Sequence, residues 1–320
     1  MATIPLPKQR ASELKGRDFL DLADFTTEDL KKLLALSVEL KEKHNKGIPY
    51  RPLEGKTLGM IFEKASTRTR VSFEVAMNQL GGQAMFLSGR DTQIGRGEPI
   101  PDTARVLSRY LDGIMIRTFG HEIVSEFARY ATVPVINGLT DLHHPCQVLA
   151  DLLTLWEKKG KLQGLHVTYV GDGNNMANSW LVAAPKLGIN LRIATPAGYE
   201  CDPQVVEQAQ RLAAYHGTEL LLTYDPIEAV KGTDMIYTDV WASMGQEEEQ
   251  RLREEHFAAY QVNKELAAHA KPDHLFMHCL PAHRGEEVTA DVIDGPNSVV
   301  FDEAENRLHV QKAIIVATMV

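Results

Sequence analysis

Apolar side chains recur along the chain with two different spacings, and the alternation between them predicts the class of fold. Residues 26–47 carry Leu30, Leu33 and Leu34 on one helical face, whereas the compact apolar run TLGMIF at 57–62 is typical of a buried strand. Further strands are predicted, in chain order, at 111–118, 133–138, 165–173, 190–196, 218–225, 234–241, 275–283 and 298–303. Helical stretches separate many of these strands, which favours parallel sheets with crossover helices.

The chain divides near residues 150–164, where a second alternating series begins. A helix that opens at Pro145 and ends at Gly160 spans this division. The last residues, RLHVQKAIIVATMV, are apolar enough to form a docked helix rather than a loose tail. We therefore expect an α/β protein with two doubly wound domains, each around a parallel central sheet, linked by helices. The first domain is predicted at 1–150, with the C-terminal helix of 304–320 docking back on it, and the second at 151–303.

Composition narrows the classes of function. The 34 basic residues against 43 acidic ones leave a formal net charge of −9, which argues against a general nucleic-acid or membrane-surface binder. No apolar segment approaches the roughly 20 residues that span a bilayer, and prolines and charges occupy the N-terminus where a signal peptide needs an apolar core. Cys146, Cys201 and Cys279 are odd in number and widely spaced, so we expect free thiols in a reducing cytoplasm.

The stretch STRTR at 66–70 lies between the predicted strand 57–62 and an amphipathic helix. Free backbone N–H groups and the positive end of the helix dipole favour an anion at such a turn. Hydroxyls from Ser66, Thr67 and Thr69, together with the guanidinium groups of Arg68 and Arg70, suit a phosphate. The alternative is a serine N-cap followed by solvated arginines.

Other predicted strands also end in polar groups, and ligands of open α/β sheets bind at those ends. Arg117 ends the strand at 111–118, and HPCQ follows the strand at 133–138. Since Pro145 suits the first helical position, His144 lies near the N-cap, where the helix dipole lowers its pKa and favours a neutral hydrogen-bond donor. Gln147, one turn on, can serve the same ligand. The alternative for His144 is a surface histidine.

The GDGNN stretch at 171–175 follows a strand and is similar to a dinucleotide-binding turn. It lacks the third glycine of G-x-G-x-x-G, because Met176 stands there, and no acidic residue obviously ends the next strand. An NAD-dependent dehydrogenase therefore remains a weaker alternative. The side-chain amides of Asn174 and Asn175 suit a ligand carboxylate or amine, and an N-cap explains only one of them.

The HCLP stretch places Cys279 beside His278. An activated thiol lining a pocket is the favoured interpretation, and a half-buried inert cysteine is the alternative. A Cys–His nucleophilic pair is conceivable, but neighbours in a strand point to opposite faces. A zinc site from Cys279, His278 and His283 matches no structural-zinc spacing.

Four ordered motifs, STRTR, HPCQ, DVWASMG and HCLP, resemble those of the ornithine carbamoyltransferase family. The first two motifs also resemble the wider carbamoyltransferase superfamily. Ser243-Met244-Gly245 and Cys279-Leu280-Pro281 point to ornithine rather than aspartate as the acceptor. The motifs cover residues 66–281, and Arg307 follows near the C-terminus.

The resemblance implies two sets of binding residues. Those for carbamoyl phosphate are Ser66, Thr67, Arg68, Thr69, Gln93, Arg117, His144, Pro145, Cys146, Gln147 and Arg307. Those for L-ornithine are Asn175, Asp239, Ser243, Met244, Cys279 and Leu280. Catalytic roles are implied for Arg117, His144, Asp239, Cys279 and Arg307.

The resemblance also implies transfer of a carbamoyl group to the side-chain amine of ornithine in arginine metabolism, with no metal or cofactor. It implies a homotrimer or an assembly of trimers. The residues leave open whether the cell makes or degrades citrulline. Putrescine, aspartate or an acylated ornithine as acceptor, and a non-catalytic homologue, remain as alternatives.

Overall fold

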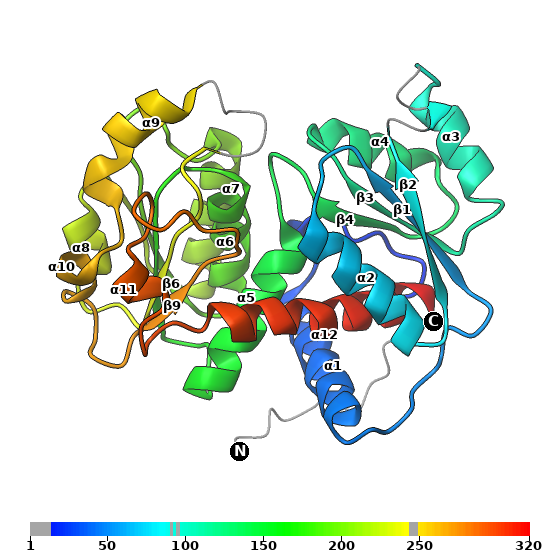
Figure 1. The fold of residues 1–320 in the computed structure, drawn as a ribbon, viewed down its shortest axis with the longest axis horizontal. Coiled ribbons are helices and arrows are strands. Elements are labelled where there is room, and N and C mark those ends of the chain that lie inside the picture. The colour runs from blue at the N-terminus through cyan, green and yellow to red at the C-terminus, as the bar shows by residue number, and fades with distance from the viewer. Residues whose placement is uncertain (1–13, 90–91, 94–96, 243–248) are drawn as a thin grey trace. The chain divides into compact units, whose positions relative to one another are not determined.

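The structure is a computed structural model that describes residues 14–89, 92–93, 97–242 and 249–320 (Figure 1). Contacts within the chain divide it into two compact units. One unit runs to Leu153 and includes Glu305–Val320, and the other is Thr154–Ala304. Helix α5 (Pro145–Lys159) and helix α12 (Val300–Met319) each contribute residues to both units.

The first unit is built on a four-stranded sheet in the order β2-β1-β3-β4, with every pair parallel. Its strands are β1 (Thr57–Phe62), β2 (Gln83–Ser88), β3 (Gly113–Arg117) and β4 (Val135–Leu139). Its other helices are the 3-10 helix Leu22–Asp24, α1 (Thr27–Asn45), α2 (Thr67–Gln79), α3 (Ile100–Leu107) and α4 (His121–Tyr130).

The second unit has a five-stranded parallel sheet in the order β7-β6-β5-β8-β9. Its strands are β5 (His166–Val170), β6 (Asn190–Ala194), β7 (Leu220–Thr223), β8 (Met235–Tyr237) and β9 (Leu275–Met277). Its helices are α6 (Asn175–Lys186), α7 (Pro203–His216), α8 (Pro226–Val230), α9 (Gln250–Phe257), the 3-10 helix Ala258–Tyr260, α10 (Lys264–Ala267) and α11 (Ala290–Ile293). The prediction of two α/β halves with parallel sheets is confirmed.

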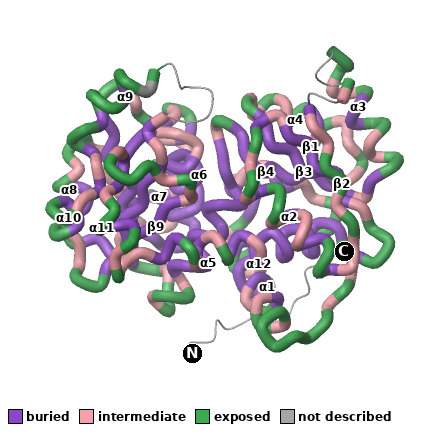
Figure 2. The backbone as a smooth tube through the Cα atoms, in the orientation of Figure 1, coloured by how far each residue is buried: buried purple, intermediate pink, exposed green. Residues whose placement is uncertain are grey.

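Helices cover both faces of the sheet in the first unit, which explains why β1, β3 and β4 are buried along most of their length (Figure 2). On one face, Ile61 and Ile116 pack against Phe127 of α4. On the other, Gly113 lets α12 approach, since a Cβ there would lie only 2.9 Å from the Met319 sulfur. Full burial of a side chain the size of isoleucine or methionine stabilises the fold by about 1.5–3 kcal/mol. Packing of this kind holds the C-terminal helix to the sheet.

Short polar side chains set the points where helices begin after strands. Ser66 caps α2 by accepting from the Thr69 amide at 3.1 Å, and Asn174 caps α6 by accepting from the Met176 amide at 2.9 Å. In α1, Thr26 and Asp29 form a reciprocal capping box. Removing such a cap costs about 0.5–2 kcal/mol of stability, so these residues help to determine where each helix begins after its strand.

The prediction of a strand at 298–303 is wrong. Ser298 makes one isolated bridge to Phe276, and the chain is helical from Val300. The helix turns Glu303 inward, where its carboxylate accepts hydrogen bonds from the His278 amide at 3.0 Å and the Tyr237 hydroxyl at 3.2 Å. Helix α12 therefore starts earlier than the apolar pattern of 307–320 indicates. No helix within the described part of the chain is long and apolar enough to cross a membrane.

Candidate functional site

The STRTR residues form the first turn of α2 rather than a loop before it. Ser66 is the N-cap, and Thr67 begins the helix directly after strand β1. Thr67 is exposed, Arg68 is half-buried and Thr69 is fully buried. The unsatisfied N–H groups of this helix end can bind an anion beside the Arg68 side chain.

Arg70 is separated from the other members of the motif. Its Nε lies 3.2 Å from the Glu74 carboxylate, and its guanidinium lies 3.9 Å from the centre of the Phe86 ring. Glu74 neutralises this arginine one turn along the helix, so Arg68 is the guanidinium of STRTR that remains for an anion. The sequence grouped the two arginines together, and the structure separates them.

Thr69 joins two arginines that come from distant parts of the chain. Its hydroxyl oxygen accepts from Arg117 Nη1 at 3.2 Å and from Arg307 Nη2 at 2.8 Å. Arg117 ends strand β3 and Arg307 lies in α12, and both are almost fully buried. Two guanidinium groups thus converge at the carboxyl end of the first sheet, where they can stabilise negative charge on a ligand oxygen.

His144 lies immediately before α5, as predicted, and is 4% exposed. Its pKa is lowered well below 6.5, first by burial and then by the charges of Arg307 and Arg117. The predicted direction is confirmed, but the causes differ from the helix dipole that the sequence suggested. A neutral imidazole donates one hydrogen bond without adding a third positive charge.

The rest of the HPCQ motif is fixed by α5 and β4. Gln147 Nε2 donates to Asp151 Oδ1 at 2.8 Å, so Asp151, which sequence reasoning missed, orients the amide. The Cys146 thiol donates to the Asn137 carbonyl at 3.4 Å, and burial raises its pKa to about 12. The Cys146 side chain is therefore a core thiol in its neutral form. Pro145 is the first residue of α5.

Three predicted site residues lie in, or next to, segments that the structure does not describe. Gln93 is exposed, and its carbonyl accepts from the Glu98 amide at 3.0 Å. Ser243 and Met244 fall outside the described residues. Their proposed roles remain predictions.

In the second unit, Asp239 connects two of the predicted motifs. Its Oδ1 accepts from the Cys279 thiol at 3.1 Å, and its Oδ2 accepts from Asn174 Nδ2 at 2.8 Å. Asp239 follows β8 and Cys279 follows β9, so this cluster lies at the carboxyl end of the second sheet. A carboxylate that accepts from a thiol and an amide can also accept from a ligand amine.

Asn174 and Asn175 have different places. Asn174 caps α6, accepts from the Tyr169 hydroxyl at 3.1 Å and donates to Asp239, whereas Asn175 is the first residue of the helix. The interpretation that one cap explains only one asparagine agrees with this arrangement. Gly173 is needed for packing, because a Cβ there would lie 2.3 Å from the Cys201 amide nitrogen. That close approach explains this glycine without a dinucleotide.

His278 is part of the core network rather than a partner that activates Cys279. Its Nδ1 accepts from the Leu280 amide at 2.9 Å, which leaves Nε2 to donate to Glu287 at 3.0 Å. The zinc set considered from the sequence is not assembled. Among the described residues, His278 and Cys279 group with Asp239, whereas His283 groups with Glu286 and Glu287. Leu280 has a positive φ of 56°, so its backbone is held in an uncommon conformation beside Cys279.

Sequence reasoning missed a buried ion pair next to this cluster. Arg253 Nη1 donates to Asp172 Oδ2 at 3.0 Å and to the Trp241 carbonyl at 2.7 Å. Burial raises the pKa of Asp172 to about 6, even though the Arg253 charge lowers it. Arg253 is one charged residue in a strongly polar helix, RLREEH, and nothing in that pattern distinguishes it from its solvated neighbours.

Two family models match the chain. The model described as "Aspartate/ornithine carbamoyltransferase, carbamoyl-P binding domain" matches residues 17–157, and the one described as "Aspartate/ornithine carbamoyltransferase, Asp/Orn binding domain" matches residues 163–318. Curated relatives agree with these models. The ornithine carbamoyltransferase of Thermococcus kodakarensis is 60% identical over 306 residues, which are 96% of this chain and 97% of the relative. The protein of Pyrococcus furiosus named "Ornithine carbamoyltransferase, anabolic" is 59% identical, with 96% of this chain and 97% of that protein covered.

Solved structures show the same fold. The ornithine carbamoyltransferase from Pyrococcus furiosus has a TM-score of 0.93 at 59% identity, covering 96% of this chain and 98% of that one. The anabolic ornithine carbamoyltransferase from Campylobacter jejuni has a TM-score of 0.88 at 43% identity, covering 94% of this chain and 98% of that one.

Proposed function

Because this chain belongs to the aspartate/ornithine carbamoyltransferase family, we propose that it is an ornithine carbamoyltransferase. It transfers the carbamoyl group of carbamoyl phosphate to the side-chain amine of L-ornithine and releases L-citrulline and phosphate. The observation that carries this proposal is the convergence of Arg117 and Arg307 on Thr69 at the anion-binding end of α2.

The first half-site binds carbamoyl phosphate. Ser66, Thr67, Arg68 and the free N–H groups of α2 hold its phosphate, with Gln93 as a further contact. Arg117, Arg307 and His144 bond its carbonyl oxygen, and Gln147, oriented by Asp151, holds its amide. Pro145 and Cys146 form the adjoining wall. We assign this role to residues 1–150 with 304–320, in agreement with the description of the family model that matches 17–157.

The second half-site binds L-ornithine, a role that we assign to residues 151–303. Asn175, Ser243 and Met244 hold the amino-acid part, while Asp239, Cys279 and Leu280 surround the side-chain amine. An alkylamine with a pKa of about 10.4 is protonated at neutral pH and cannot attack a carbonyl, so the enzyme needs its neutral form. The thiol and amide around Asp239 orient the carboxylate that receives this amine.

The chemistry follows from these groups. The neutral amine attacks the carbamoyl carbon, and negative charge develops on the carbonyl oxygen. Arg117, Arg307 and the N–H of neutral His144 stabilise that oxygen. The bond between the carbamoyl carbon and the phosphate oxygen then breaks, phosphate leaves with the bonding electron pair, and the proton lost by the nitrogen passes to the departing phosphate. The positive end of α2 and Arg68 stabilise the departing phosphate.

We place the reaction in arginine biosynthesis, because relatives at 59% and 43% identity are named as anabolic enzymes. The three cysteines are free, which supports a reducing compartment such as the cytoplasm.

We also propose a homotrimer. Strand β2 lies at the edge of its sheet, where Met85 and Phe86 are 50% and 37% exposed, and Val71 of α2 is 52% exposed. An apolar face beside an open strand edge is typical of an interface between chains. Light scattering would give about 107 kDa, three times the chain mass of 35.6 kDa, for a cyclic trimer. Met85→Asp is expected to lower this mass, whereas Tyr215→Asp, at a side chain that is 84% exposed, is the control. A wild-type mass of one chain would contradict the proposal.

The activity is tested by incubating the purified chain with carbamoyl phosphate and, separately, ornithine, acetylornithine, putrescine or aspartate. Carbamoylated product and phosphate are both measured. Product from ornithine alone is expected. Product from another amine alone would overturn the assignment of the second half-site and leave the first intact. Absence of any product from folded chain that binds carbamoyl phosphate would favour a non-catalytic homologue.

A further inference from the structure

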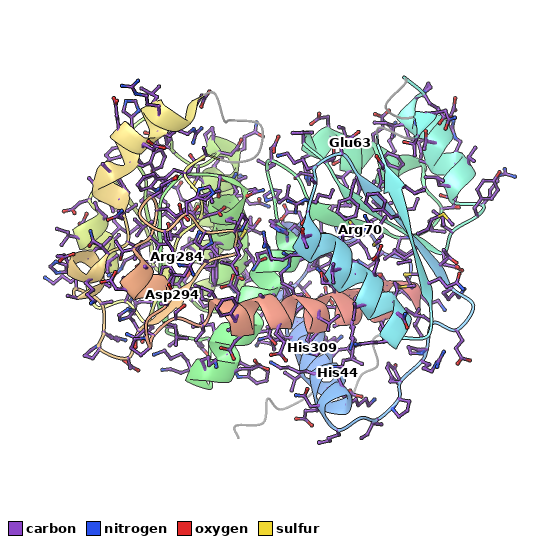
Figure 3. All side chains as sticks on the ribbon, viewed as in Figure 1. His44, Glu63, Arg70, Arg284, Asp294 and His309 are labelled. Atoms are coloured by element: carbon purple, nitrogen blue, oxygen red, sulfur yellow. The ribbon has the colours of Figure 1, made fainter. Side chains whose placement is uncertain are left out.

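A cavity of about 220 Å³ lies in the first unit, apart from the residues of the half-site described above. The end of α1, the segment at 47–50, the end of α2 and Lys312 of α12 line it. Figure 3 shows this part of the molecule at the labelled residues His44 of α1 and His309 of α12. Their ring centres are 5.7 Å apart.

Lys312 is the unusual member of the lining. Its side chain is 4% exposed, and among the described residues its ammonium has no hydrogen bond or ion pair. Burial alone lowers its pKa to about 8. A buried charge normally has a partner, because removing it from water is costly. The open space beside Lys312 can hold that partner.

Besides Lys312, the lining of the cavity holds the basic residues Lys43 and His44 and, among the described residues, no carboxylate. Burial and then the charges of Lys312, Lys41 and His44 lower the pKa of His309 to about 3, so His309 is neutral at pH 7. Lys41 Nζ already donates to Asn306 Oδ1 at 2.7 Å. A lining that holds basic side chains and no described acid favours an anion.

Nearby carboxylates have other partners. Glu39 pairs with Lys43 at 2.6 Å, and Glu42 pairs with Lys46 at 3.1 Å. Glu305 lies 3.5 Å from His309 Nε2, with its side chain 52% exposed. None of these contacts involves Lys312, and no described carboxylate forms an ion pair with it.

The remaining lining is apolar. Leu40 and Leu80 are buried, and Ile48 is 51% exposed. The centre of the Tyr50 ring lies 4.3 Å from the Lys43 ammonium nitrogen. An inorganic anion would leave this surface unused. We propose that the cavity binds a small organic carboxylate, with its carboxylate group on Lys312 and its apolar body against Ile48 and Tyr50. The proposal does not depend on the proposed reaction.

The test is calorimetric titration of the full chain with benzoate in phosphate buffer, where phosphate fills the anion site at α2. One saturable site with a Kd of about 1 mM is expected, and benzamide, the neutral analogue, should bind at least about tenfold more weakly. Lys312→Met should weaken benzoate binding at least about tenfold. Lys31→Met, an exposed position on α1, is the matched control and should leave the affinity unchanged.

Circular dichroism checks that the Lys312→Met chain is folded. Ile48→Asp keeps Lys312 and adds a negative charge at the cavity mouth, so it should also weaken binding. Equal affinities for wild type and both variants, equal affinities for benzoate and benzamide, or no saturable binding by about 50 mM would each overturn the proposal. Binding that occurs only without phosphate would also overturn it, because benzoate would then occupy the anion site.

Discussion

Arg307 donates to the Thr69 hydroxyl across 238 positions of sequence, at 2.8 Å and in a fully buried setting. The same oxygen accepts from Arg117 at 3.2 Å. One hydroxyl of the first turn of α2 therefore aligns two guanidinium groups that come from a strand end and from the C-terminal helix. Helix α12 thus supplies a buried guanidinium group to this end of the sheet as well as packing.

Thr69→Val should lower kcat/KM for carbamoyl phosphate by about 10–100-fold. Valine keeps the shape but removes the acceptor, so two buried arginines lose a partner and their alignment. Steady-state kinetics with saturating ornithine measures the effect. Thr168→Val is the control, since Thr168 is equally buried in the second unit and donates to the Ala229 carbonyl at 2.8 Å. Equal losses in the two variants would indicate a general packing defect.

His144→Asn should lower kcat by about 10²–10³-fold, because it removes a positioned donor to the developing oxyanion. Since burial and two arginines hold the pKa of His144 well below 6.5, the wild-type imidazole should stay neutral between pH 6 and pH 9. Nitrogen-15 NMR of the ring measures this state directly. A ring that gains its proton as the pH falls from 7 to 6 would contradict the structure. His216→Asn, at the end of α7, is the activity control.

Cys279→Val should raise the KM for ornithine by about tenfold, while Cys279→Ser should have a smaller effect. Serine retains a donor to Asp239 Oδ1, whereas valine leaves that oxygen without the 3.1 Å contact. Initial rates at varied ornithine and fixed carbamoyl phosphate distinguish the variants. Cys201→Ala changes a buried cysteine whose pKa burial raises to about 12, and it should leave the KM for ornithine unchanged. An equal effect of serine and valine would show that the hydrogen bond is unimportant.

Arg253→Gln should raise the KM for ornithine by about tenfold or more and leave the KM for carbamoyl phosphate nearly unchanged. Arg253 holds the Trp241 carbonyl and Asp172, which belong to the DVWASMG and GDGNN motifs respectively. It acts as a positioning residue, and the contrast between the two KM values separates this role from general destabilisation. Arg251→Gln is a matched control on the same helix, since its side chain is 94% exposed. An equal rise in both KM values would refute a role confined to the second half-site.

Lys312→Met should raise the free energy of unfolding by up to about 3 kcal/mol at pH 7. The folded pKa is about 8 and the reference value is 10.5, so the buried charge destabilises the fold fully below pH 8. As the pH rises from 8 to 10.5, the folded state loses the proton first, and the cost declines. The advantage of the variant should therefore shrink at high pH. Urea unfolding at pH 7 and at about pH 10 measures both values. A variant no more stable than wild type at pH 7 would contradict this account of Lys312.

Local pattern was sufficient for much of the fold. The strands at 57–62 and 113–117 and the helices near 27–45, 145–159 and 203–216 follow from apolar spacing, proline and capping residues. Strand β2 and helices α3 and α4 were not predicted, and β2 is largely exposed, so its apolar residues show no core periodicity. At 298–303, the buried partners of Glu303 favour a helix over the strand that its apolar neighbours suggest.

By itself, the sequence determined which polar residues follow each strand. It also predicted that they gather at one edge of each sheet, because the carboxyl ends of parallel strands meet there. Only the tertiary structure decided how those residues pair. It placed Arg307 on Thr69, distinguished Arg68 from Arg70, joined Asn174 to Asp239, and left Lys312 buried beside open space. The physical reason is that desolvation and charge pairing depend on packing between distant residues, which spacing along the chain does not encode.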